Sequence, residues 1–164
     1  VRIENFSDSS IDMLVECFTK TSEWKKFIEV KENLAIKIKE IVEAEKGYGD
    51  GKVYHGNLGS VRTYNHIDDA IKAYWLAVER CDYGEVYNIG GNHTCTVGEA
   101  LDMLISKTEV EIEKEYDESR ARPTDITLQI PDSTKFREKT GWEPKKNLED
   151  ICDDLLTYWR KEIK

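Results

Sequence analysis

Short strand-like segments alternate along the chain with longer segments whose apolar residues recur at the helical period, and this alternation most constrains the fold. The predicted strands are 1–5, 52–55, 61–64, 85–89 and 110–116. Interleaved strands and helices are typical of an α/β domain. Because the connections are irregular and several strands are very short, we expect a small mixed sheet with flanking helices, and not a complete doubly wound fold.

Two helices are predicted before residue 50. The first follows the possible N-caps Ser7–Ser10 and carries an apolar face made of Ile11, Leu14, Val15 and Phe18. The second is expected to run from about Ser22 to Lys46 and to end at Gly47, with Leu34, Ile38 and Ile41 facing inward. Its opposite face, which includes Lys37, Lys39 and Glu40, has the charges of a solvated surface.

Four further helices are predicted after the third strand, 61–64. One begins at His66-Ile67-Asp68-Asp69 and carries an apolar stripe made of Ile71, Tyr74, Trp75 and Val78. The negative charges of Asp68 and Asp69 are favourably placed at the positive end of this helix, or the two residues are no more than caps. Another follows Thr96-Val97-Gly98-Glu99, which has the form of a capping box, and faces Leu101, Leu104 and Ile105 inward. The last two span 132–139 and 148–159, the latter with Leu148, Ile151, Leu155 and Trp159 inward.

Composition limits the classes of function. The 164 residues suit one domain, 1–164, and the 33 acidic against 24 basic side chains give a net charge of −9, which disfavours nucleic acid or an anionic membrane as partner. The four cysteines are far apart, the three histidines show no metal-ligand spacing, and no apolar run has the length of a signal or membrane segment. We therefore expect a cytoplasmic protein with reduced thiols and no metal.

Four residues carry polar groups suited to a nucleotide-sugar ligand or another anion. Arg122 precedes Pro123, which favours an extended conformation, and a guanidinium there can hold two phosphate oxygens; the alternative is a surface ion pair with Asp125. Arg62 lies in a predicted strand and is either a binding group or a solvated edge-strand charge. Asn5 and Asn57 can bind a sugar or base, although asparagine after glycine is also ordinary turn chemistry.

Dinucleotide chemistry has no sequence support in this chain. Gly90-Gly91 follows a predicted strand, but the pattern G-x-G-x-x-G is missing, so we reject a dinucleotide site there. The chain also has no G-x-S-x-G, Walker or H-E-x-x-H motif, and the spacing Tyr-x-x-x-Lys occurs only across the turn signal Gly49-Asp50-Gly51, between Tyr48 and Lys52.

Taken in order, these segments resemble the C-terminal part of extended short-chain dehydrogenases that act on nucleotide sugars, most closely the GDP-mannose 4,6-dehydratase and GDP-6-deoxy-mannose reductase group. The resemblance covers about Asn33 to Trp159 and rests on Leu34-Ala35-Ile36-Lys37-Ile38, Gly56-Asn57-Leu58 through Arg62, His66-Ile67-Asp68-Asp69, Arg122-Pro123-Thr124-Asp125 and Gly141-Trp142-Glu143-Pro144.

The resemblance implies a role for seven residues. Lys37, Arg62 and Arg122 would contact the nucleotide diphosphate, Asp125 would lie near ribose hydroxyls, and Asn5 would touch the sugar; Asn57 and Leu58 belong to the matched binding loop. Two departures, Ser7-Asp8-Ser9 in place of Gly-Pro after the asparagine and Thr63 in place of Asp, affect the sugar end of the pocket more than the phosphate end.

In such enzymes the NAD(P)-binding loop and the catalytic Ser/Thr, Tyr and Lys precede the region that this chain matches. The leading hypothesis is therefore a nucleotide-sugar-binding portion, of GDP-mannose type, of a dehydratase, epimerase or reductase, inactive by itself and completed by a Rossmann-domain partner or a longer polypeptide. The rival is a stand-alone, non-catalytic interaction module that reuses this fold, which an apolar patch around Val1, Ile3 and Phe6 on a monomer, or a homo-oligomer such as a dimer that buries it, would favour. A purely helical regulatory domain is a third hypothesis, against which the strand-like segment 86–89 argues.

Overall fold

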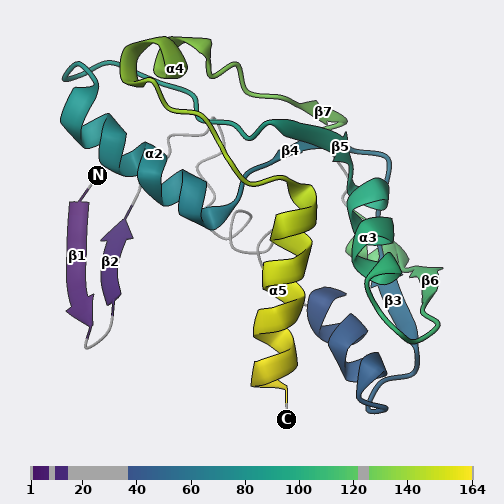
Figure 1. Ribbon diagram of the computed structural model, residues 1–164. Coiled ribbons are helices and arrows are strands. Elements are labelled where there is room, and N and C mark those ends of the chain that lie inside the picture. The colour runs from purple at the N-terminus through teal and green to yellow at the C-terminus, as the bar shows by residue number, and fades with distance from the viewer. Residues whose placement is uncertain (1, 8–9, 15–36, 122–125, 164) are drawn as a thin grey trace. The chain divides into compact units, whose positions relative to one another are not determined.

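The computed structural model describes residues 2–7, 10–14, 37–121 and 126–163, and it divides into two compact units, Val1–Leu34 and Ala35–Lys164 (Figure 1). The single domain expected from the length stays a prediction. Within the described ranges, short strands combine with flanking helices, so the expected mixed α/β architecture is confirmed.

The first unit contains a β-hairpin where the sequence predicted a strand followed by a helix. Strand β1 (Arg2–Ser7) pairs antiparallel with β2 (Ser10–Leu14), from Arg2 opposite Leu14 to Ser7 opposite Ser10, with an irregularity between Ile3 and Asn5. The helix predicted after Ser7 is therefore wrong over 10–14. The partner strand supplies backbone bonds that no local helix signal could reveal.

The second unit holds two small sheets. Strand β3 (Lys52–His55) pairs in parallel with β6 (Glu113–Tyr116), and β4 (Val61–Tyr64) lies between antiparallel β5 (His93–Thr96) and parallel β7 (Leu128–Gln129). Strand β5 was not predicted, and β6 is shorter than the predicted 110–116. The predicted strand 85–89 has no regular structure.

Helices complete the second unit, beginning with helical residues 37–45, which end near Gly47 at φ 75° as predicted. The others are α2 (Ile67–Arg80), α3 (Val97–Ser106), a 3₁₀ turn (Glu118–Arg120), α4 (Thr134–Thr140) and α5 (Leu148–Glu162). The predicted capping box is present at α3, where Thr96 and Glu99 bond to each other's backbone N–H groups.

Two apolar clusters form the core of the second unit. The larger joins the helical residues 37–45, β3, α3 and α5, which lie together in Figure 1, through Ile38, Ile41, Val42, Val53, Ala100, Leu101, Leu104, Leu148, Cys152 and Leu156. The smaller contains Ala73 of α2, Phe136 of α4 and Trp142. The inward positions predicted for Ile38, Ile41, Leu101 and Leu104 are confirmed, whereas Ile71, Trp75 and Val78 of the stripe predicted on α2 are exposed.

Candidate functional site

The loop between β3 and β4 is shaped by its own polar groups. Asn57 accepts a hydrogen bond from the Gly59 N–H at 2.8 Å and donates one from Nδ2 to Ser60 Oγ at 3.1 Å. Leu58 packs its half-buried side chain against the larger cluster, and its carbonyl accepts from the Gly98 N–H at 2.9 Å. These contacts show the turn chemistry of Asn57, and its ligand-binding role stays a prediction.

This loop lies directly against the chain that leads into Arg122. A Cβ atom at Gly56 would fall 2.2 Å from the Arg120 carbonyl oxygen, so glycine permits a backbone approach that any other residue would block. On the other side of residues 122–125, the Thr127 carbonyl accepts a hydrogen bond from the Val61 N–H at 2.8 Å. The described residues on both sides of 122–125 thus contact the segment 56–61, while the predicted binding residues Arg122 and Asp125 lie outside the described residues.

Arg120 is the centre of a polar cluster that sequence reasoning missed. Its guanidinium contacts Glu40 Oε1 at 2.8 Å and the Tyr54 carbonyl at 2.9 Å, and it stacks 5.6 Å from the Tyr54 ring centre. The Glu40 side chain is 19% exposed and Arg120 24% exposed, so the predicted solvated role of Glu40 is wrong. This pair ties the helical residues 37–45 to β3, and the only sequence signal for it was a second arginine two residues before Arg122.

Lys37 is half-buried and lies on the same helical segment, 37–45, as Glu40. The charges of Arg120 and Glu40 both affect its pKa. Burial lowers the pKa of Lys37, the positive charge of Arg120 lowers it further, and Glu40 opposes the shift. The charges of Lys37 and Arg120 therefore repel one another in a partly desolvated place, and Glu40 offsets part of this repulsion. Such a place favours an added anion, because an anion would relieve their repulsion.

Arg62 lies in the middle strand of its sheet, opposite Cys95 on β5 and Gln129 on β7. The alternative of a solvated edge-strand charge is therefore wrong, because the strand is central and the side chain is half-buried. Its Nη1 donates to the Val61 carbonyl at 2.8 Å. Asn5 lies on β1 of the first unit, opposite Asp12. Its side chain is not among those that the structure describes, so its predicted contact with the sugar stays a prediction.

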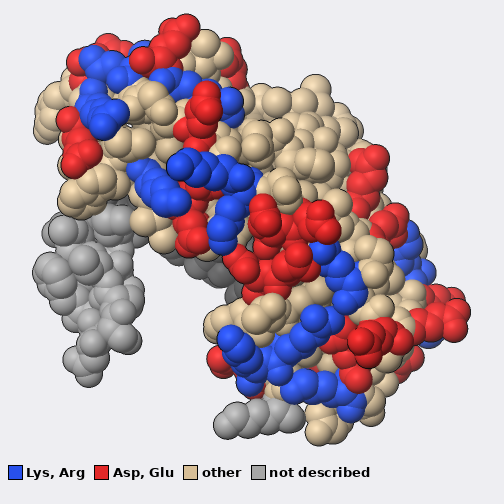
Figure 2. All heavy atoms as spheres, viewed as in Figure 1, with Lys and Arg blue, Asp and Glu red and all other residues tan. Residues whose placement is uncertain are grey.

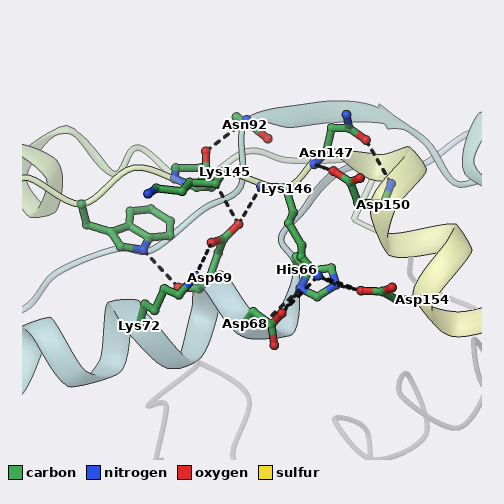
Figure 3. Close-up of polar contacts among 12 residues, drawn as sticks. His66, Asp68, Asp69, Lys72, Asn92, Lys145, Lys146, Asn147, Asp150 and Asp154 are labelled. Atoms are coloured by element: carbon green, nitrogen blue, oxygen red, sulfur yellow. Dashed lines mark hydrogen bonds and ion pairs between the residues drawn. The ribbon is translucent and has the colours of Figure 1, made fainter. Parts of the chain in front are cut away.

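A second polar network fixes the start of α2 (Figure 3). His66 is the N-cap: its Nδ1 accepts from the Asp68 N–H at 3.1 Å, which leaves Nε2 to donate to Asp154 Oδ2 of α5 at 2.9 Å. Lys146 joins the same carboxylates, at 3.1 Å from Asp68 and 2.8 Å from Asp154. The bond from Lys146, followed by that from His66, lowers the pKa of Asp154.

The two aspartates of α2 have different roles. Asp69 is 1% exposed, and its Oδ2 accepts from the N–H groups of Lys145 and Lys146, both at 2.9 Å (Figure 3). Burial opposes ionisation of Asp69, but these two backbone bonds keep its pKa below the usual value. Asp68 is 52% exposed at its side chain. The network therefore positions α2 against the turn before α5, and it is structural.

Gly90 and Gly91 do not offer a phosphate cradle. A Cβ at Gly90 would lie 2.6 Å from Pro131 Cγ, and one at Gly91 would lie 1.7 Å from the Tyr64 carbonyl oxygen. The space that a ligand phosphate would need is thus filled by protein atoms, and β5 follows these glycines instead of a helix. The residues present do not fit a dinucleotide cofactor at this point.

Charge is mixed over the face shown in Figure 2, where lysine and arginine side chains alternate with acidic ones. Within the described ranges, no helix is long and apolar enough to cross a membrane. The same residues contain no group of three or more His, Cys, Asp or Glu side chains that could hold a metal ion.

Solved structures of known proteins superpose on the fold described above. The structure of RMD from Pseudomonas aeruginosa complexed with NADPH superposes with a TM-score of 0.73 at 19% identity, over 80% of this chain and 43% of that one. The UDP-glucose 4-epimerase of Thermotoga maritima, solved with UDP-glucose, gives a TM-score of 0.60 at 30% identity over 80% of this chain and 40% of its own. The fold is therefore that of the extended short-chain dehydrogenases of the epimerase/dehydratase class.

The family within this class follows from sequence. The sequence profile of the GDP-mannose 4,6 dehydratase family matches residues 13–155, and this chain belongs to that family. It is 29% identical over 111 residues to GDP-mannose 4,6 dehydratase 1 of Arabidopsis thaliana, a match that covers 64% of this chain. The match covers only 29% of the length of that relative, and 32% and 29% of the length of two other curated relatives.

Proposed function

We propose that this chain is the nucleotide-sugar-binding portion of an NAD(P)-dependent nucleotide-sugar dehydratase, epimerase or reductase. The observation that carries the proposal is that the predicted loop at Gly56 lies against the Arg120 carbonyl, while Glu40, on the same helix as Lys37, binds the Arg120 guanidinium. Burial and the positive charge of Arg120 lower the pKa of Lys37. A nucleotide diphosphate is the anion that this family handles, so the cations would hold its phosphates.

Each predicted residue has a part in this pocket. Lys37 and Arg122 would neutralise the diphosphate, with Arg122 binding two oxygens at once because its guanidinium is planar. Arg62 would contact the diphosphate or nucleotide from the central strand, and Asp125 would accept from ribose hydroxyls. Asn57 and Leu58 would form the loop wall, and Asn5 would contact the sugar.

GDP-mannose is the proposed ligand type, and its support is the family to which the chain belongs. The Thermotoga maritima neighbour was solved with UDP-glucose, which makes a uridine nucleotide the natural competitor in any binding experiment. The Pseudomonas aeruginosa neighbour was solved with NADPH, which supports NAD(P) as the cofactor of the complete enzyme. Because Gly90-Gly91 cannot cradle phosphate, that cofactor and the catalytic groups would be supplied from outside this chain.

Isothermal calorimetry of the purified chain tests the proposal. We expect GDP and GDP-mannose to bind with a Kd below about 1 mM, and Arg122→Ala to weaken binding at least tenfold, because a desolvated guanidinium–phosphate contact is worth roughly 1.5–3 kcal/mol. Arg160→Ala is the matched control, since Arg160 pairs with Glu45, at the opposite end of the helical residues 37–45 from Lys37. No binding at millimolar ligand, or equal affinity in Arg122→Ala, would refute the proposal.

The second candidate is a stand-alone interaction module. The exposed apolar residues of α2 favour this view, because single helices of monomeric domains rarely leave such a stripe uncovered. A chain that fails to bind any nucleotide sugar but forms a stable dimer through α2 would establish it.

A further inference from the structure

Strand β7 lies at an outer edge of its sheet and carries exposed apolar side chains. Among the described residues the strand order is β5-β4-β7, so β7 has a partner on one side (Figure 1). The strand and the residues around it, 126–130, read Ile-Thr-Leu-Gln-Ile. Ile126, Leu128 and Ile130 are 59%, 61% and 54% exposed. Because alternate residues of an extended chain share a face, these three form one apolar row, here named the β7 row.

The backbone groups of the β7 row point to the free edge of the sheet. The Thr127 carbonyl accepts from the Val61 N–H at 2.8 Å, so it points to β4. Successive residues of a strand direct their backbone groups to opposite edges, and those of Leu128 therefore point away from β4. The same alternation turns the backbone groups of Ile126 and Ile130 outward. Outward backbone groups beside an exposed apolar row are a template for pairing with another strand.

This edge also differs from a neighbouring one in its charge. The outer strand β6 carries Glu113, Lys114 and Glu115, and such charges on an edge oppose pairing with another chain. Residues 126–130 contain no charged side chain. Figure 2 shows an uncharged area over the place that β7 has in Figure 1. Two copies of a chain with net charge −9 repel one another least where the contact contains no charge.

We propose that β7 pairs antiparallel with β7 of a second copy of this chain, so that two sheets join into one. The occupant is a second copy because the pattern apolar, polar, apolar, polar, apolar reads the same in both directions. With Leu128 opposite the partner's Leu128, Ile126 lies opposite the partner's Ile130, and each apolar side chain of the row meets another. This two-fold contact uses the free edge of β7 in both copies, so assembly through β7 stops at a dimer.

The inference does not depend on nucleotide-sugar binding, so sedimentation equilibrium of the purified chain without nucleotide tests it. Pairing of two short strands gives a small interface of the weak, transient kind, and we expect a monomer–dimer equilibrium with a Kd of roughly 10–100 µM. Leu128→Lys should raise this Kd at least about tenfold, because the two added charges would face each other across the two-fold axis.

Tyr158→Lys on α5 is the matched control. It adds the same charge at an apolar residue that is 57% exposed and lies outside the β7 row, so the Kd of the dimer should stay within about twofold. Because Leu128 is 61% exposed, Leu128→Lys should keep the circular dichroism spectrum of the unmodified chain.

Amide hydrogen exchange of the unmodified chain, followed by NMR, tests the register without any substitution. The Leu128 N–H would donate to the partner's Leu128 carbonyl, whereas the Gln129 N–H points to β4. Tenfold above the Kd, the Leu128 amide should exchange at least about threefold more slowly than tenfold below it, since most of the protein is then dimeric. The Gln129 amide should exchange at the same rate at both concentrations.

Several results would overturn the inference. They are a monomer at all concentrations up to about 1 mM, a Kd that Leu128→Lys leaves unchanged, and equal dissociation by Tyr158→Lys. Equal dependence of the Leu128 and Gln129 amides on protein concentration would exclude the proposed register. A dimer that dissociates in Val78→Lys but not in Leu128→Lys would place the contact on α2 instead, where Val78 is 73% exposed.

Discussion

Replacing Asp69 by alanine tests whether the start of α2 is held by this buried carboxylate. Asp69 is 1% exposed and accepts two backbone N–H groups, from Lys145 and Lys146, at 2.9 Å each. Alanine would leave both donors without this acceptor, and each buried unsatisfied donor costs about 1–3 kcal/mol. Since part of the new cavity can admit water, we expect a loss of about 2–4 kcal/mol in the free energy of unfolding.

Urea denaturation followed by circular dichroism measures this loss, and Asp68→Ala is the matched control. Asp68 is the preceding residue of the same helix end, but its side chain is 52% exposed and pairs with Lys146 at 3.1 Å. An exposed pair contributes at most about 1 kcal/mol, so Asp68→Ala should cost less than this. Equal losses in the two variants would refute the reasoning, because they would show that helix-end charge and not the buried bonds stabilises this place.

Three further predictions concern the candidate site and its support. Glu40→Gln should weaken GDP binding roughly three- to tenfold in calorimetry, because it removes the carboxylate that holds the Arg120 guanidinium. Glu43→Gln, which breaks the surface pair with Lys39, should leave GDP binding unchanged. Tighter GDP binding by Glu40→Gln would contradict this. Gly91→Ala should lower the free energy of unfolding by at least about 1–3 kcal/mol, because its Cβ would overlap the Tyr64 carbonyl. Burial raises the pKa of Tyr64 to about 12. An unfolded tyrosine titrates at about 10, so the stabilisation from the neutral Tyr64 hydroxyl is complete below that pH and is lost as the pH rises toward 12. The urea midpoint should therefore fall with pH in this range, and less steeply in Tyr64→Phe. Equal slopes of urea midpoint against pH in the two proteins would contradict this.

Local signals were read correctly from the sequence where a few neighbouring residues decide the structure. The Thr96 to Glu99 capping box and the helix stop at Gly47 depend on contacts within one helical turn, and both are confirmed. The family resemblance was also correct, because it rests on several segments in a fixed order.

Partners far away in the chain explain the predictions that were wrong. Residues 10–14 carry a helical spacing of apolar residues, but their pairing with β1 decides their structure. The stripe on α2 was found by its period, yet a helix with two apolar faces does not reveal which one its own domain covers. Residues 85–89 have a strand pattern without a partner in the described ranges, and the pair of Glu40 and Arg120 joins residues eighty positions apart, a contact that spacing cannot show.

The most direct test of the central claim is a titration of the isotope-labelled chain with GDP-mannose, followed by backbone amide NMR shifts. The account predicts saturable shifts clustered at residues 37–40, 56–62 and 120–127, with Ile71, Trp75 and Val78 of α2 unaffected. Saturable shifts confined to other residues, or none up to millimolar ligand, would contradict it.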